Sequence, residues 1–317
     1  MRVLVTGAAG FIGSAVVRDL IRLGGVSVVG VDSFTPYYSR VQKESNIAEL
    51  LTERCFEFHE IDLLEPDIGY LFDGVDVVYH LAAQPGVRSS WGHDEFGEYV
   101  VQNVLATQRV LQESVHSGVA RCVYASSSSV YGNTATYPTH EDVVPKPFSP
   151  YGVTKLAAEH LCSLYGDNFG LNVTSLRFFT VYGPAQRPDM AIHRMIECAL
   201  DGEVFDVYGG GSHVRSFTYV TDVVDAVIRA SHGGNGVAVV NVAGGESVEM
   251  RELVELVGEA TGRRLNVNYG SELAGDVKKT DGSVERAWSL FGWKPKVNLM
   301  EGLAAQVEWH VWRRSRS

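Results

Sequence analysis

Short apolar runs alternate with amphipathic stretches along the first half of the chain. The runs are rich in β-branched residues and occupy 2–6, 26–32, 55–62, 75–83, 121–127 and 171–178. The clearest helical stretches between them cover 11–23, 95–117 and 151–168. Strands that alternate with helices at this spacing predict an α/β fold, a doubly wound parallel sheet with helices on both faces.

The alternation loosens after Phe178, where Gly- and Pro-rich segments become frequent. Further helices are predicted at 191–200, 218–230, 250–262 and within 288–315, and a returning strand at 238–245. We therefore expect a nucleotide-binding domain over 1–178, to which 212–245 returns. Residues 179–317 would mainly form a smaller, interleaved C-terminal lobe that binds the substrate.

Composition excludes several classes of protein. The 317 residues carry a net charge of −11, which disfavours a nucleic-acid partner because phosphate backbones require a basic face. No apolar run approaches the roughly 20 residues of a membrane helix. A strand pattern begins directly after Met1, so we expect no signal peptide.

Cysteine and histidine usage points to the cytoplasm and to no metal. The four cysteines are scattered without a CxxC pair, which favours a reducing compartment over a disulfide framework. The ten histidines lack the spacing typical of metal ligands. We therefore predict a cytoplasmic protein without a metal site.

The segment TGAAGFIG, Thr6–Gly13, joins the first strand to the first helix. Gly7 would allow the tight turn, Gly10 the approach of a pyrophosphate, and Gly13 close packing of helix on sheet. Asp32 ends the next strand, where a carboxylate would bind the ribose hydroxyls of NAD and repel the phosphate of NADP. A purely structural turn is the alternative. The other cofactor contacts predicted in this Rossmann-type domain are Phe11, Ile12, Asp62, Leu63, Leu81, Ala82 and Ala83.

The segment SPYGVTK places Tyr151 and Lys155 four residues apart, on one face of a helix. A phenol with a pKa near 10 is a poor base at neutral pH. A lysine ammonium one turn away, together with a positively charged nicotinamide, would stabilise the phenolate. Lys155 could also hold the nicotinamide ribose. Both residues are therefore predicted catalytic and cofactor-binding groups.

The motifs TGxxGxxG, SSSxVYG and YxxxK, in this order, resemble those of the extended short-chain dehydrogenase/reductases that act on sugar nucleotides. The resemblance covers essentially the whole chain. It implies that Ser127 is the catalytic hydroxyl, which bonds the substrate's 4-hydroxyl and relays its proton to Tyr151. It also implies a homodimer built on the helices at 95–117 and 151–168.

The residues after Ser127 distinguish between reactions within the family. The 4,6-dehydratases that this chain resembles have Asp-Glu here, and nucleotide-glucuronate decarboxylases have a Glu just before Val-Tyr-Gly. This chain has Ser128 and Ser129 instead. Dehydration and decarboxylation need a further proton transfer. The absence of these acidic residues therefore favours 4-epimerisation, which needs only reversible hydride transfer.

The segment TVYGPAQRPDMA is similar to that of UDP-glucuronate 4-epimerases, as is the GVR of residues 86–88. The resemblance implies that Arg187 meets a sugar carboxylate bidentately. Arg187 could instead be an ion-pair partner within its loop, and Arg88 a surface residue. Ser216 replaces an Asp usual in the family beside the diphosphate arginine. The predicted substrate contacts are Val87, Arg88, Ser127, Ser128, Thr180, Arg187, Arg215 and Asp276.

These observations predict NAD-dependent 4-epimerisation of UDP-glucuronate to UDP-galacturonate. Three alternatives stay open: a UDP-glucose 4-epimerase, a UDP-glucuronate decarboxylase, and a non-catalytic NAD-sensing protein on the same fold. The last is disfavoured because Tyr151 and Lys155 are both present.

Overall fold

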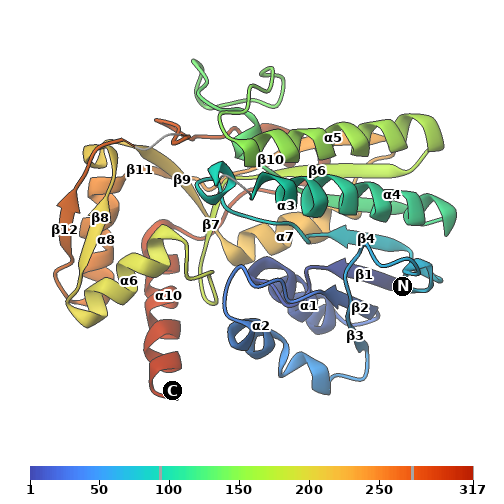
Figure 1. The fold of residues 1–317 in the computed structure, drawn as a ribbon, viewed down its shortest axis with the longest axis horizontal. Helices are drawn as coiled ribbons and strands as arrows, with labels where there is room; N and C mark the ends of the chain where they lie inside the picture. Colours follow the sequence, from blue (N-terminus) through green and yellow to red (C-terminus); the bar gives the residue numbers. More distant parts are fainter. Residues whose placement is uncertain (93–94, 273–274, 317) are drawn as a thin grey trace.

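The computed structural model describes residues 1–92, 95–272 and 275–316 (Figure 1). Within these ranges, seven parallel strands form the central sheet in the order β10-β6-β5-β4-β1-β2-β3. The strands are β1 Arg2–Thr6, β2 Ser27–Asp32, β3 Phe56–Glu60, β4 Val77–His80, β5 Arg121–Ser127, β6 Asn172–Phe178 and β10 Val237–Val242. The predicted Rossmann-type α/β fold is confirmed.

Helices cover both faces of this sheet (Figure 1). On one face α1 (Phe11–Leu23) packs against α7 (Val220–Ala230), and on the other α4 (Ala106–His116) packs against α5 (Pro150–Phe169). Successive residues of β1 point to opposite faces: Val3 and Val5 are buried under α1 and α7, whereas Leu4 is buried under α4 and α5. Both faces are apolar because both are covered.

The helix predicted at 95–117 is continuous but not uniform. It consists of α3 (Phe96–Val100), a π-helical turn (Val101–Leu105) and α4. A π turn widens the helix locally and often marks a functional site. Here it directs the buried Asn103 at the cofactor cavity wall, where its side chain bonds both backbone groups of Gln84 at 2.8 and 3.1 Å.

A smaller lobe lies beside the central sheet, at the left of Figure 1. Its helices are α6 Ala191–Asp201, α8 Met250–Thr261 and α10 Leu299–Arg314, which share one apolar core with the small strands. Its strands are β7 Thr180–Tyr182, β8 Val204–Val207, β9 Val214–Tyr219, β11 Ser247–Glu249 and β12 Asn266–Tyr269. They form a sheet of order β11-β9-β7 and the pair β12-β8. The remaining helices are α2 Arg40–Ile47 and α9 Glu285–Phe291.

The interleaving runs through residues 212–245. Helix α7 and strand β10 lie with the central sheet, whereas β9, between Ser212 and α7, belongs to the sheet of the smaller lobe. The chain therefore crosses between the two parts at Tyr219, where β9 ends and α7 begins. None of the helices in the described ranges has the length and apolar character needed to cross a membrane.

Candidate active site

A long cavity follows the carboxyl ends of β1, β2 and β4. Every predicted cofactor contact except Asp62 lines it, namely Gly7, Gly10, Phe11, Ile12, Gly13, Asp32, Leu63, Leu81, Ala82, Ala83, Tyr151 and Lys155. Asp62 lies next to this cavity, in a shallow depression with Ser33 and Ile61. Its carboxylate accepts a 2.9 Å bond from the Leu64 amide. Where strand 75–83 was predicted, β4 stops at His80, and residues 81–83 leave the sheet to form the cavity wall.

The glycine turn fits a closely approaching dinucleotide. Gly7 has φ +70°, and a Cβ on it would lie 2.8 Å from the Ala82 nitrogen. A Cβ on Gly13 would lie 2.0 Å from the Gly7 carbonyl oxygen, so the helix can pack this close to the turn only without a side chain. Helix α1 begins after Gly10 without a side-chain cap, which leaves amide groups of its first turn to a pyrophosphate.

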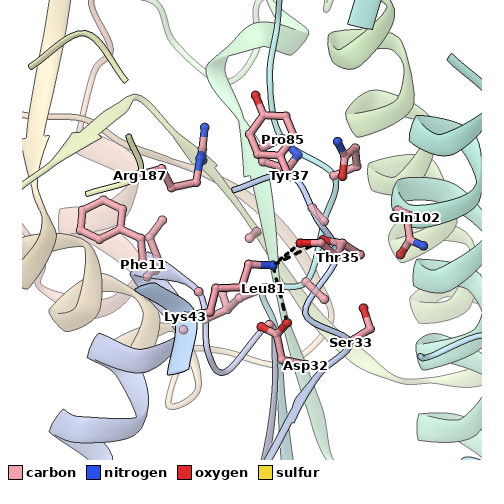
Figure 2. Close-up of a pocket in the computed structure, with 18 of the residues that line it drawn as sticks. Phe11, Asp32, Ser33, Thr35, Tyr37, Lys43, Leu81, Pro85, Gln102 and Arg187 are labelled. Atoms are coloured by element: carbon pink, nitrogen blue, oxygen red, sulfur yellow. Dashed lines mark hydrogen bonds and ion pairs between the residues drawn. The ribbon is translucent and has the colours of Figure 1, made fainter. Parts of the chain in front are cut away.

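Asp32, the predicted ribose contact, lies at the end of this cavity away from Arg187 (Figure 2). Its two carboxylate oxygens accept bonds from the amides of Ala9 at 3.1 Å and Phe34 at 2.8 Å. Lys43 lies beside it, with Nζ 3.9 Å from Oδ1 and 2.9 Å from the Thr35 carbonyl oxygen. Burial lowers the pKa of Lys43, and Asp32 opposes that shift. A carboxylate at this place fits the ribose hydroxyls of NAD.

Lys43 is a cofactor-site residue that the sequence analysis missed. It lies on α2, a helix that was not predicted because RVQKESNI is mostly polar. Its burial would have identified it, but burial on a mostly polar helix cannot be seen without the folded structure. Tyr37, on the preceding loop, was missed for the same reason and lines the same cavity.

Tyr151 and Lys155 lie in the first turns of α5 and face the same cavity. The Lys155 ammonium donates a 2.8 Å bond to the Ala125 carbonyl oxygen of β5. Burial lowers the pKa of Lys155 to about 7. Burial raises the pKa of Tyr151, while the hydrogen bond from Ser127 and the charge of Arg187 lower it. The predicted catalytic residues Ser127, Tyr151 and Lys155 are thus brought together.

The amino-terminal end of α5 is held firmly in place. The Ser149 hydroxyl caps the helix by accepting a 3.1 Å bond from the Gly152 amide, and Pro150 occupies the first helical position. The Ser90 hydroxyl accepts a 3.1 Å bond from the Tyr151 amide. Tyr99 contacts the Tyr151 ring edge-on. These contacts fix the direction of the Tyr151 phenol.

The four serines 126–129, of which the first two end β5, make different hydrogen bonds. Ser126 donates a hydrogen bond to Glu159, a buried carboxylate of α5. The Ser127 hydroxyl accepts a 3.1 Å bond from the Ser129 amide, which turns the chain after the strand. All four serines line a second cavity between the central sheet and the smaller lobe.

All the predicted substrate contacts line this second cavity: Val87, Arg88, Ser127, Ser128, Thr180, Arg187, Arg215 and Asp276. Tyr151, Phe178 and Arg187 are among the residues that line both cavities, so the two spaces meet beside Tyr151. A molecule in the second cavity would therefore have one end at the phenol. Tyr208 and His213, which the sequence analysis did not single out, line the far part.

Arg187 is held by Asp189 in a bidentate ion pair, with Nε–Oδ1 and Nη2–Oδ2 distances of 2.9 Å. Tyr37 donates a 3.2 Å bond to the same carboxylate from the cofactor side. Arg187 and Tyr37 lie together at the end of the cofactor cavity away from Asp32 (Figure 2). Both interpretations of Arg187 thus meet in one geometry: it is an ion-pair partner in its loop, and it borders the substrate cavity.

Arg88 and Asp276 form an ion pair with each other, at 2.8 Å. The Arg88 guanidinium also lies over the Tyr208 ring. Arg215 donates to the carbonyl oxygen of Val214, at 2.9 Å. Ser216, which replaces the usual Asp, is buried and donates to the Gly244 carbonyl oxygen at 3.4 Å. Strand β9 therefore keeps a polar side-chain bond next to Arg215.

One cluster in the described ranges could hold a metal ion: His193, Glu197 and His310, whose candidate ligand atoms lie within 4.8 Å of one another. Most of its polar atoms already have partners, although the buried His310 Nε2 has none among the residues that the structure describes. Glu197 is bonded by His310 and Arg314, and the His193 ring nitrogen Nδ1 is 2.8 Å from the Gln186 carbonyl oxygen. The geometry is that of a hydrogen-bonded strut between α6 and α10.

Comparisons with known proteins agree with this geometry. The model of the NAD dependent epimerase/dehydratase family matches residues 3–243. A Bacillus subtilis (strain 168) relative, named an uncharacterized UDP-glucose epimerase, YtcB, is 39% identical over 311 residues, which cover 97% of both chains.

Two solved structures are also similar over nearly the whole chain. UDP-glucuronic acid 4-epimerase from Bacillus cereus, in complex with UDP-glucuronic acid and NAD, is 38% identical with a TM-score of 0.95, covering 99% of this chain and 100% of that one. MoeE5, in complex with UDP-glucuronic acid and NAD, is 44% identical with a TM-score of 0.88 and the same coverage. MoeE5 is also known in complex with UDP-glucose and NAD. The fingerprint, the fold and these matches together confirm the resemblance drawn from the motifs: the chain belongs to the NAD dependent epimerase/dehydratase family.

Proposed function

We propose that this protein catalyses the NAD-dependent 4-epimerisation of a UDP-hexuronic acid, UDP-glucuronate to UDP-galacturonate. The observation that carries the proposal is the meeting of the two cavities at Tyr151, with Arg187 on the border of both. The first cavity has the glycine turn and the carboxylate that fit NAD. The lining of the second cavity includes both Ser127, the predicted hydroxyl next to Tyr151, and Arg215, the predicted diphosphate contact. The similar Bacillus cereus enzyme, which binds UDP-glucuronic acid and NAD, supports the choice of substrate.

The chain's residues would do the proton work of the reaction. NAD bound in the first cavity would supply reversible hydride transfer at C4 of the sugar. Tyr151, as phenolate, would accept the proton of the 4-hydroxyl through or alongside Ser127, and would return it to the epimeric alcohol. Lys155 would stabilise the phenolate by its charge. The cavity must let the 4-keto sugar turn about its diphosphate linkage, so Arg215 and Asp276 would hold the nucleotide while the sugar moves.

The carboxylate of the substrate brings a hazard that the site must control. Oxidation at C4 makes a β-keto acid, which loses carbon dioxide when its carboxylate is desolvated and aligned with the carbonyl π system. Arg187, with the hydroxyls of Ser127, Ser128 and Thr180, would keep the negative charge localised on the carboxylate. This ground-state stabilisation would slow decarboxylation. The absence of a Glu at Ser129 removes one acid that a decarboxylase uses.

A UDP-glucose 4-epimerase is the second candidate, favoured by one observation. Asp189 already occupies two donors of Arg187, so the guanidinium is partly neutralised before any substrate arrives. A neutral sugar could occupy such a site without displacing anything. The name of the Bacillus subtilis relative and the UDP-glucose complex of MoeE5 fit this candidate.

Product analysis by proton NMR separates the candidates. NAD-loaded protein is given UDP-glucuronate and UDP-glucose in separate tubes, as wild type and as Arg187→Ala. The proposal predicts UDP-galacturonate from the first tube, little UDP-galactose from the second, and loss of the first activity in the variant. UDP-galactose alone would establish the neutral-sugar reaction, and UDP-xylose would establish decarboxylation. If Arg187→Ala releases no more carbon dioxide than wild type, the protective role of Arg187 is wrong.

Three further features belong to the proposal. We infer that 1–178, with 212–245, carries the cofactor and that 179–317 mainly carries the substrate.

A homodimer is supported by half-exposed apolar residues on the outer side of α5 and the adjoining π turn, namely Leu105, Val153 and Leu164. A cytoplasmic location is supported by four cysteines without disulfide bonds.

A further inference from the structure

We propose that Gln306, on the C-terminal helix α10, is a positioning residue that fixes the Arg187 loop and thereby the preference for an acidic sugar. The inference rests on the proposed role of Arg187. Gln306 is fully buried, yet it lies outside both cavities and on a helix that has no part in the chemistry.

The Arg187 loop, residues 183–190, connects β7 to α6 and has almost no backbone bonding partners in neighbouring strands. Side chains replace them. The Gln306 amide accepts a 2.9 Å bond from the Gly183 amide and donates a 2.8 Å bond to the Gln186 side-chain oxygen. Gln186, one residue before Arg187, donates in turn to the Val181 carbonyl oxygen at 2.9 Å. Gln306 therefore ties both ends of the turn to α10.

Helix α6 closes the same network from the other side. The His193 amide donates a 3.0 Å bond to the Gln186 side-chain oxygen, and its Nδ1 lies 2.8 Å from the Gln186 carbonyl oxygen. Gln186, His193 and Gln306 are each at least 97% buried. Polar side chains at this depth hold one arrangement strictly, because a broken bond leaves a buried group without a partner.

The loop needs this support because its backbone is strained. Ala185 has φ +65°, a left-handed conformation that is uncommon for a residue with a side chain. Without Gln306 the turn would relax toward an ordinary conformation, and Arg187 would move with it. Longer bonds hold the loop from the other side: Tyr37 donates to Asp189 at 3.2 Å, and Gln42 donates to the carbonyl oxygens of Ala185 at 3.4 Å and Gln186 at 3.3 Å. The buried network has the shorter bonds and is thus the tighter of the two supports that fix Arg187 relative to Ser127 and Tyr151.

Binding measurements in a Tyr151→Phe background test the proposal without turnover. Isothermal titration gives the dissociation constants of UDP-glucuronate and UDP-glucose for the NAD-loaded protein, and their ratio is the preference. Gln306→Leu keeps the shape and removes both bonds, so the preference should fall about tenfold. Gln306→Glu keeps only the acceptor for the Gly183 amide, should lower it as well, and serves if the leucine variant does not fold.

Leu253→Ala is the matched control. Leu253 is fully buried in the same apolar core but lies on α8 and bonds nothing in the loop. It should lower the melting temperature and leave the preference unchanged. In an Arg187→Ala background, Gln306→Leu should cause no further loss of preference, because Gln306 acts on the preference only through the contact between Arg187 and the sugar carboxylate.

Two results would count against different parts of the argument. If Gln306→Leu melts earlier but keeps the full preference, Gln306 is structural and the inference is wrong. If the Tyr151→Phe protein itself shows no preference for UDP-glucuronate, the carboxylate role of Arg187 fails, and with it the proposed function.

Discussion

Arg177 on β6 holds Glu159 on α5 in a bidentate ion pair, with Nε–Oε1 and Nη2–Oε2 distances of 2.9 and 2.7 Å. Both side chains are only 4% exposed. The same carboxylate accepts the hydroxyl of Ser126, and the guanidinium lies over the ring of Tyr131. This ion pair connects α5, which carries Tyr151, to the central sheet, where Arg177 lies opposite Ser126. It therefore fixes the end of β5 and the turn after Ser127 relative to Tyr151.

Removal of one partner should be costly because the other charge would remain buried. Glu159→Ala is expected to lower the free energy of unfolding by about 3–5 kcal/mol, measured by urea denaturation. Arg22→Ala is the control, since its ion pair with Asp19 is on the surface and should contribute less than about 1 kcal/mol. Equal losses in the two variants would mean that the buried pair contributes no more than a surface one.

The Tyr151 hydroxyl should be needed for chemistry far more than for binding of NAD or of the sugar nucleotide. Tyr151→Phe removes the proton acceptor, and the rate of epimerisation should fall about 10²–10⁴-fold. The NAD content and the affinity for UDP-glucuronate should stay near wild type, as absorbance and titration would show. Tyr165→Phe changes a tyrosine of the same helix that bonds Gln108 instead, and should keep full activity. Substantial activity in Tyr151→Phe would move the proton transfer to another group.

The central sheet and the residues that line the two cavities beside it were predictable from the sequence because both leave local patterns. Alternation of strand and helix identifies the sheet, and the spacings of Gly7 to Gly13 and Tyr151 to Lys155 identify the two sites. The smaller lobe was harder to predict, because strands of three or four residues such as β7 and β8 are too short for an alternating pattern to be recognised. Predicted strands also ran too long at their carboxyl ends, where residues such as Leu81 leave the sheet to line the cavity.

Partners of charged residues were predictable only within a loop, as for Arg187, and not where they are far apart in the sequence. Arg88 pairs with Asp276 over 188 positions of sequence, and Lys43 meets Asp32 only because α2 folds back over β2. Ser126 and Ser127 look equivalent in the sequence. In the structure both line the second cavity, but only Ser126 bonds Glu159, because the pleat of β5 sends successive side chains to opposite faces.

Stability should fall in mild acid because of the buried His80. Its ring bonds Thr6 at 2.8 Å and Thr107 at 3.0 Å, and burial with the nearby charge of Lys155 lowers its pKa from 6.5 to about 3. The unfolded chain therefore binds a proton that the folded protein refuses. The stabilisation is complete above pH 6.5 and is lost progressively as the pH falls toward 3.

Between pH 7 and pH 5 this one histidine should lower the free energy of unfolding by about 2 kcal/mol. The window lies above the range in which most carboxylates titrate. Urea denaturation at pH 7, 6 and 5 measures the slope, which should become about half as steep in His80→Gln, because burial also lowers the pKa of His310, to about 4. His232→Gln, a change of an exposed histidine that follows α7, should leave the slope as in wild type. An unchanged slope in His80→Gln would assign the acid sensitivity to other groups.

The proposed dimer should depend on the outer face of α5. Leu164 is 52% exposed there, on the same side as the half-exposed Val153. Burial of such a face against a second copy would remove apolar surface from water, whereas a carboxylate at its centre would be desolvated without a partner. Leu164→Asp should therefore convert the dimer to a monomer, as seen by light scattering coupled to size exclusion. Leu290→Asp is the control, because Leu290 is 44% exposed on α9, away from this face. A Leu164→Asp protein that remains dimeric would place the interface elsewhere.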